Sequence, residues 1–227
     1  QVFKAIELAT KAKRAIKRIA KKSTGEIARV VQEVAIMKTL DHTNIIKLFE
    51  TFEDDDYLYL VLEYCSGGDV LDRIISDGVM DEMSSAMVMR GMLATLNYLN
   101  ANGYVHRDIK PENIMYKDSK DDQMVSQLRL VDFGYSCRSP EEGKALRTRV
   151  GSPYYVAPEV LAGNYGKECD MWSIGAMCFM LLAGIPPFFG ETDAQTLRMV
   201  KEGRFVCQVS QWHSITKGCK HFVKRCL

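Results

Sequence analysis

The sequence has no excess of charge of one sign. Its 227 residues include 30 Lys and Arg against 29 Asp and Glu, so the formal net charge is +1. A chain this close to neutrality has no general attraction for nucleic acid or for an acidic membrane. We therefore predict that it binds no nucleic acid and that its electrostatic function depends on local groups of charges.

Long hydrophobic runs are also absent. The longest, MWSIGAMCFMLLAG at 171–184, has about fourteen residues, whereas a membrane-spanning helix needs about 20. We predict a buried core helix that ends at Gly184, and no membrane span. The N-terminal residues show no apolar signal-peptide run or cleavage site. We expect a cytoplasmic protein, with any membrane association carried by segments outside this sequence.

The cysteines lack the spacing of a metal or redox site. There are seven of them, an odd number, and they are scattered without a CxxC pair. This distribution indicates reduced thiols in a cytosolic protein. For Cys169 and Cys178, a small buried side chain is a better interpretation than a metal ligand or a nucleophile.

Strand-like patterns dominate before about residue 62, and helical patterns dominate after it. RAIKRIA and YLYLVLEY are rich in alternating, β-branched or aromatic residues, and a helical segment at 26–40 separates them. After YCSGG, apolar residues recur at steps of three and four, at Leu71, Ile74, Ile75, Met89, Met92, Leu93, Leu96 and Leu99. We predict an α+β fold with a small sheet-rich lobe and a larger helical lobe.

Two short strand-like runs follow inside the helical part. NIMY and LRLVDF flank the polar stretch KDSKDDQMVSQ, which predicts an exposed hairpin connection.

Four short motifs occur in a fixed order along the chain. They are RAIK at 14–17, HRDIKPEN at 106–113, VDFG at 131–134 and VAPEV at 156–160. Each is a modest signal alone, but together and in this order they match the catalytic domain of a protein kinase. The chain therefore resembles a eukaryotic protein kinase over nearly its whole length.

The resemblance implies a bilobal kinase fold and a reaction. The N-lobe would occupy 1–62, the hinge 63–66, the C-lobe 67–227 and the activation segment 132–159. The reaction would be transfer of the γ-phosphate of ATP, with Mg²⁺ as cofactor, to Ser or Thr hydroxyls of protein substrates. Lys110 is the Ser/Thr form of the catalytic loop, and no tyrosine-kinase signature follows it.

The polar residues of HRDIKPEN suit phosphoryl transfer. Asp108 can orient the substrate hydroxyl and accept its proton, and Lys110 can reach the transferring phosphate. The amide oxygen of Asn113 and the carboxylate of Asp132 are hard donors suited to Mg²⁺. We predict that these four residues are catalytic and that Asn113 and Asp132 bind the metal. Ser152, where threonine is usual, can bridge Asp108 and Lys110.

The resemblance also implies a nucleotide site. Lys17, which shares a strand face with Ala15, would grip the α- and β-phosphates and be held by Glu33. The predicted nucleotide-binding residues are Val2, Ala15, Lys17, Glu33, Leu62, Glu63, Cys65, Asp69 and Met115. Without the resemblance, Glu33 would be read as a surface residue and both Val2 and Met115 as core. The other basic residues near Lys17, among them Lys22, are interpreted as solvated surface.

The long stretches around the hinge and after Gly151 are similar to calcium-dependent protein kinases of plants and protists. This similarity implies basic substrates, with Asp69 and Glu112 receiving an arginine, and calcium regulation of the full-length protein. No DxDxDG calcium loop is present, so a calcium-sensing regulatory domain is expected outside this chain. Thr148 lies where many relatives are phosphorylated, but an unmodified loop threonine is an equal alternative.

The similarity stops at the two ends. No glycine-rich phosphate loop is present, and Gln1, Val2 and Phe3 align only with its end, so this loop either lies upstream of the sequence or is missing. The sequence also lacks an initiating Met, and we expect it to be a fragment. Two alternatives to an active protein kinase stay open. One is a pseudokinase that acts as a nucleotide-binding scaffold. The other is a small-molecule kinase, which VAPEV disfavours because such enzymes generally lack this segment.

Overall fold

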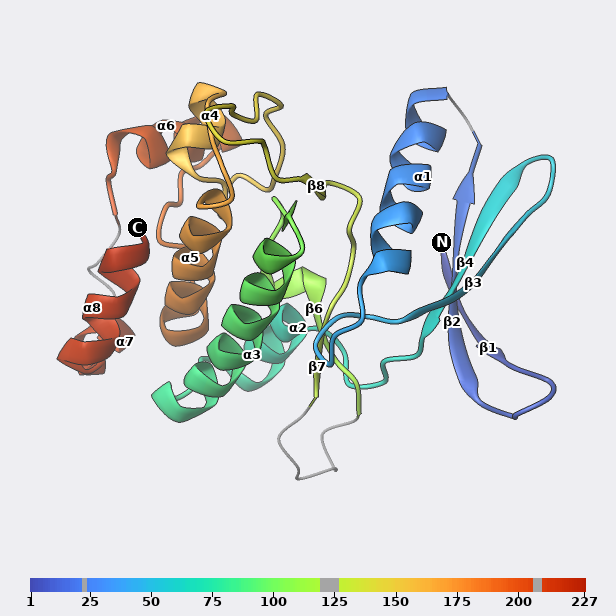
Figure 1. Cartoon of the computed structure of the whole chain (residues 1–227). Coiled ribbons are helices and arrows are strands. Elements are labelled where there is room, and N and C mark those ends of the chain that lie inside the picture. The colour runs from blue at the N-terminus through green and yellow to red at the C-terminus, as the bar shows by residue number, and fades with distance from the viewer. Residues whose placement is uncertain (22–23, 119–126, 206–209) are drawn as a thin grey trace. The chain divides into compact units, whose positions relative to one another are not determined.

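The computed structural model describes residues 1–21, 24–118, 127–205 and 210–227 (Figure 1). Contacts divide the chain into two units: Gln1–Gly68 with Ile114–Gly134, and Asp69–Asn113 with Tyr135–Leu227. The first unit is mainly sheet and the second mainly helix, which confirms the predicted α+β fold. Residues 114–134 belong to the first unit, whereas the kinase resemblance places them in the larger lobe.

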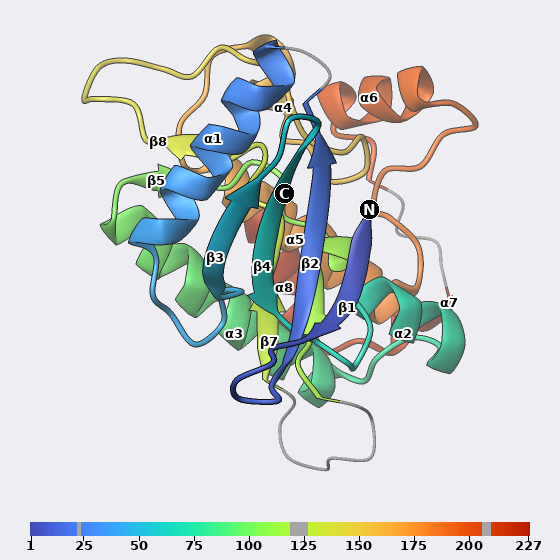
Figure 2. The same ribbon diagram turned by 90° about the vertical axis from the view of Figure 1, so that its right-hand side faces the viewer.

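A four-stranded antiparallel sheet forms the centre of the first unit (Figure 2). Its order is β1-β2-β4-β3, with β1 at Val2–Ile6, β2 at Lys13–Ala20, β3 at Leu48–Glu53 and β4 at Tyr57–Glu63. Lys17 of β2 pairs with Val2 on one side and with Leu60 on the other. Directly opposed residues share a face of a sheet. The face that carries Lys17 is therefore lined by apolar neighbours.

The helix of the first unit is α1 (Thr24–Thr39), which contacts β3. The prediction of a helix at 26–40 is confirmed, with an earlier start. Val30, Glu33, Ile36 and Met37 are buried, and their spacing of three and four places them on one face of the helix. Glu33 is the one charged member of this buried face.

A short antiparallel ladder of β6 (Ile114–Tyr116) and β7 (Leu128–Leu130) completes the first unit. The prediction that LRLVDF is a strand is wrong beyond Leu130. Asp132 has a φ of +61°, a left-handed conformation that an extended strand cannot include. Residues 119–126 of the predicted connection at 117–127 lie outside the described residues, as do Lys22 and Cys207.

Seven helices of the second unit are described, and α5 lies at its centre. They are α2 (Val70–Asp77), α3 (Glu82–Ala101), α4 (Pro158–Ala162), α5 (Cys169–Ala183), α6 (Asp193–Glu202), α7 (Ser210–Ser214) and α8 (Lys217–Cys226). α5 contacts α3, α7 and α8, and all of its residues except Met171 are buried. It ends at Gly184, which has a φ of 76°. The predicted core helix is confirmed.

Several smaller features of the second unit were not evident in the sequence. Tyr104–Val105 (β5) pairs with Cys137–Arg138 (β8), and Pro111–Asn113 forms one 3₁₀ turn. Ile75, expected on the buried face of its helix, is 73% exposed, because α2 buries only Val70 and Ile74.

The cysteines are free throughout the described part of the chain. Cys169 and Cys178 are buried, and burial raises the pKa of both thiols, which agrees with their interpretation as small core residues. Among the described helices, none is both long and apolar enough to cross a membrane.

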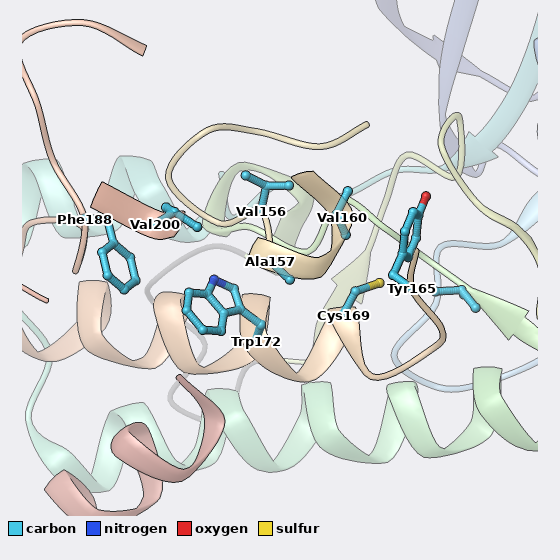
Figure 3. Close-up of a cluster of buried hydrophobic side chains, with 9 residues drawn as sticks. Val156, Ala157, Val160, Tyr165, Cys169, Trp172, Phe188 and Val200 are labelled. Carbon is cyan, nitrogen blue, oxygen red and sulfur yellow. The ribbon is translucent and has the colours of Figure 1, made fainter. Parts of the chain in front are cut away.

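A buried apolar cluster joins α5 to segments that precede and follow it in the chain (Figure 3). Its members are Val105, Val156, Ala157, Val160, Tyr165, Cys169, Trp172, Phe188 and Val200. The rings of Trp172 and Phe188 stack with centroids 5.5 Å apart and planes 11° from parallel. This packing anchors the VAPEV segment on the central helix.

We expect Phe188→Ala to lower the free energy of unfolding by about 3–5 kcal/mol, because it removes a fully buried ring and leaves a cavity. Phe189→Ala is the matched control. Phe189 is 56% exposed and stacks on Tyr154, so we expect a loss of about 1 kcal/mol or less. Urea denaturation measures both, and equal losses would contradict the packing described.

Candidate active site

Asp108 is the centre of a hydrogen-bonded group in the second unit. Its carboxylate accepts from the Ser152 hydroxyl at 2.9 Å and from the Asn113 amide nitrogen at 2.9 Å, and Lys110 Nζ lies 2.8 Å from Oδ2. Lys110 also donates to Ser152 Oγ at 2.9 Å. The predicted bridge through Ser152 is therefore confirmed. Asp108 is only 5% exposed, and these donors compensate its buried charge.

The orientation of Asn113 follows from the 3₁₀ turn that begins at Pro111, whose fixed φ favours a turn. The amide nitrogen of Asn113 donates to the backbone oxygen and to a carboxylate oxygen of Asp108, both at 2.9 Å. Since both bonds use the nitrogen, the amide oxygen is the atom left for a cation.

The loop before Asp108 is held by a buried carboxylate. Asp170 is 1% exposed and accepts from the backbone N–H groups of His106 at 2.8 Å and Arg107 at 2.7 Å. Burial raises the pKa of Asp170 to about 6 despite these two bonds. The carboxylate is thus still ionised at neutral pH. Arg107 has a φ of +69°, which is uncommon outside glycine, and the bonds to Asp170 keep it there.

Arg107 also contacts the activation segment. The Arg107 side chain donates to the backbone oxygen of Tyr135 at 2.6 Å and to the Tyr165 hydroxyl at 3.2 Å. Tyr165 in turn donates to the backbone oxygen of Thr148 at 2.5 Å. Phosphorylation of Thr148 stays a prediction.

Two acidic side chains lie near the catalytic loop. Asp69 caps α2, since its carboxylate accepts from the backbone N–H of Asp72 at 2.8 Å. Glu112 has a buried carboxylate oxygen without a partner in the described structure. Burial and the negative charges of Asp108 and Asp69 raise the pKa of Glu112, although Lys110 opposes this. An unpaired buried acceptor of this kind is suited to a cationic ligand.

The first unit contains the second charged group. Lys17 Nζ lies 2.8 Å from Glu33 and 3.6 Å from Asp132. Burial alone lowers the pKa of Lys17, but the two carboxylates outweigh it and raise the pKa. The lysine therefore stays charged. The backbone of Gly134 packs closely against this group of charges, because a Cβ at this position would lie 3.1 Å from the Asp132 carboxylate.

A cavity of about 580 Å³ opens beside Lys17. Val2, Arg18, Arg29 and Tyr57 are among its lining residues. Its cationic side chains can attract an anionic ligand such as a phosphate.

The apolar residues predicted to hold adenine belong to the first unit. Ala15 pairs with Leu62 across β2 and β4, two residues along from the pair of Lys17 and Leu60. Because strand residues two apart share a face, these residues line the same side of the sheet. Burial raises the pKa of the Cys65 thiol to about 11, so the thiol is protonated at neutral pH.

One charged residue of this unit was missed in the sequence. Arg129 lies in β7, is 6% exposed and forms a two-pronged contact with Glu63. Burial raises the pKa of Glu63, but Arg129 and Lys117 outweigh burial and lower it. The signal available was a single basic residue in the otherwise apolar run LRLV at 128–131.

The structure thus brings together two sets of predicted residues. Lys17, Glu33 and Asp132 meet in the first unit, and Asp108, Lys110 and Asn113 meet in the second. The shared role of Asn113 and Asp132 in metal binding stays a prediction, because they belong to different units.

The donor chemistry of these residues fits Mg²⁺, which binds through one or two protein oxygens together with water and phosphate. Within the described ranges, no cluster of three or more His, Cys, Asp or Glu residues is arranged to hold a metal by itself.

Comparison with known proteins shows one family. The model of the protein kinase domain matches residues 1–227. Calcium-dependent protein kinase 3 of Plasmodium berghei (strain Anka) is 41% identical over 226 residues, which cover 100% of this chain and 40% of the relative. Calcium-dependent protein kinase 5 of Plasmodium falciparum (isolate 3D7) is 40% identical, with 100% and 39% covered. The chain spans about 40% of the length of these relatives.

We expect Asp170→Ala to lower the free energy of unfolding by about 2–5 kcal/mol at pH 7.5, because two backbone donors lose their acceptor. Asp170→Asn keeps one acceptor oxygen and should cost less. Glu191→Ala, on an exposed side chain, is the control, with a change of about 0.5 kcal/mol or less. Denaturant titration measures all three, and a stable Ala variant would contradict the assigned role.

Proposed function

The chain belongs to the protein kinase domain family, and from this premise we propose that it transfers the γ-phosphate of ATP to Ser or Thr hydroxyls of protein substrates. The observation that carries the proposal is the geometry around Asp108. All five residues that such a reaction needs are present: Lys17, Glu33, Asp108, Asn113 and Asp132.

Asp108 would orient the substrate hydroxyl and accept its proton. Its carboxylate is held by Asn113 and Ser152, so little reorganisation is needed when the hydroxyl arrives. Lys110 forms an ion pair with the same carboxylate. It would turn towards the transferring phosphate and offset the charge that develops there.

The nucleotide would be held by the first unit and Asp69. Lys17, kept charged and in place by Glu33, would bind the α- and β-phosphates. Val2, Ala15, Leu62, Cys65 and Met115 would surround adenine, and Asp69 would meet the ribose or a basic substrate side chain. Asn113 and Asp132 would hold Mg²⁺, which when bound neutralises phosphate oxygens and aligns the γ-phosphate.

Basic substrates are the proposed preference. Glu112 supplies a buried carboxylate oxygen without a partner in the described residues, and Asp69 adds a second negative charge nearby. A substrate guanidinium can donate to both carboxylates.

Calcium regulation is proposed for the longer protein. The relatives are named calcium-dependent kinases, and this chain covers about 40% of their length. A calcium-sensing domain would lie outside the chain, which has no DxDxDG loop of its own. We propose the cytoplasm as the location, which agrees with the free cysteines of the described residues. Any membrane association would depend on segments outside this sequence.

A pseudokinase scaffold is the alternative function. No residue substitution favours it, since the lysine, both metal-binding candidates and the candidate base are intact. Nucleotide binding by the wild-type protein without any transfer to peptide would support the scaffold.

We expect Asp108→Asn to reduce kcat for peptide phosphorylation by about 10²- to 10⁴-fold, because the positioned proton acceptor is lost. Binding of ATP should change little, since Asp108 would contact the acceptor hydroxyl. A radiolabelled-phosphate transfer assay and a nucleotide titration measure the two effects. Unchanged transfer would refute the role of Asp108.

We expect Glu112→Gln to raise KM about tenfold for a peptide with arginine before the acceptor serine, and to leave kcat unchanged. A peptide with norleucine at that position should show no such rise. Because the pKa of Glu112 is raised, the wild-type preference for arginine should also weaken on acidification earlier than an ordinary glutamate would allow.

The Gln variant should lack that pH dependence. Glu141→Gln, on an exposed side chain, is the matched control and should behave as the wild type. An arginine preference that survives in Glu112→Gln would assign the contact to another residue.

A further inference from the structure

Arg129 is a buried cation on the short strand β7, and its contacts fall on separate segments of the first unit. Its Nε donates to Glu63 Oε2 at 2.7 Å, and its Nη2 donates to Glu63 Oε1 at 3.0 Å. Its Nη1 donates to the backbone oxygens of Thr43 and Leu128. The guanidinium therefore joins the 43–46 segment and the end of β4 to β7.

Backbone bonds reinforce this junction. Leu130 donates to the oxygen of Asn44 at 2.7 Å and accepts from Ile46 at 3.0 Å. The Asn44 side chain donates to the oxygen of Leu128 at 3.1 Å. Glu63 donates its own N–H to Lys47 at 2.9 Å. Glu63 is thus held through both its side chain and its backbone.

The chain after Glu63 is held from the other side. Ser66 donates to the backbone oxygen of Lys117 at 2.9 Å, and Gly67 donates to that of Tyr116 at 3.0 Å. A Cβ on Gly67 would lie 2.2 Å from the oxygen of Asp118, so only glycine allows this approach. Between the two fixed points, the N–H of Cys65 donates to no group in the described part of the chain.

We propose that Arg129 is a positioning residue for the nucleotide. It would act through Glu63, by fixing the backbone of residues 63–65 at the spacing that adenine requires. Arg129 also lies directly across the β6–β7 ladder from Met115, one of the predicted nucleotide-binding residues. The inference rests on the proposed nucleotide-binding function and adds to it a residue outside the kinase motifs.

The chemistry favours positioning over stability alone. A two-pronged contact between guanidinium and carboxylate fixes the relative orientation of its partners. A buried ion pair often adds no more stability than well-packed apolar side chains of similar size. The specific effect of Arg129 should therefore be seen in the geometry of the hinge backbone, and it should be separable from folding.

The test compares Arg129→Met and Arg129→Lys with Lys21→Met, which removes an exposed ion pair with Glu53 in the same unit. The dissociation constant of a fluorescent ADP analogue is measured, together with KM for ATP, KM for peptide and kcat. For Arg129→Met we expect the dissociation constant and KM for ATP to rise about tenfold, as for loss of one charge-assisted contact. KM for peptide and kcat at saturating ATP should stay within about twofold.

The two other variants calibrate this result. Arg129→Lys should be intermediate, because an ammonium reaches Glu63 without the two-pronged geometry. Lys21→Met should match the wild type. If Arg129→Met folds poorly because Glu63 is left unpaired, Arg129→Met/Glu63→Gln removes the unpaired charge and should fold while still binding ADP weakly.

Three results would overturn the inference. They are unchanged nucleotide affinity in a folded Arg129 variant, an equal rise in KM for peptide, and full recovery of ADP binding in the double variant. A wild-type protein that binds no ADP would overturn the proposed function and this inference together. Wild-type binding with an unaffected Arg129 variant would overturn the inference alone.

Discussion

The buried carboxylate of Asp170 is the interaction on which the catalytic loop depends. It belongs to the first turn of α5, a helix whose residues are almost all buried, and it accepts from two successive backbone N–H groups of the loop. The loop is therefore attached to a helix that is almost entirely buried in the second unit. Asp108, Lys110 and Asn113 follow directly, and their side chains bond to one another and to Ser152. The residues proposed for chemistry are thus placed by a carboxylate that bonds to the backbone of the loop.

The two units use the same physical device. In the first unit, the buried carboxylate of Glu33 pairs with the Lys17 cation. In the second unit, the buried carboxylate of Asp170 accepts from backbone N–H groups of the catalytic loop. Each also holds one non-glycine residue of the site at positive φ, Asp132 in the first and Arg107 in the second. Such conformations persist only where surrounding contacts determine them. The hydrogen bonds around both residues supply those contacts.

The sequence predicted what depends on local pattern and motif. The apolar run at 171–184 predicted α5, and the helical pattern at 26–40 predicted α1, because periodicity records which face of an element is buried. The Ser152 bridge followed from the motif. The end of β7 could not be predicted in this way. Asp132 has a positive φ and accepts a hydrogen bond from the backbone N–H of Gly134, and neither feature is visible in the pattern of residue types. Asp170 and Arg129 were missed because their partners are distant in sequence, and a lone charged residue does not identify a buried partner. The role of each site residue in catalysis is still a prediction.

The cap of α2 has a consequence for ligand recognition. One carboxylate oxygen of Asp69 accepts from the backbone N–H of Asp72, and this bond restricts the side chain. An incoming cation would then meet an acceptor whose conformational entropy was already lost when the helix formed. Formation of the first turn of α2 and binding of a cation by Asp69 are therefore coupled in free energy. Fraying of this turn should weaken the binding of a positively charged group.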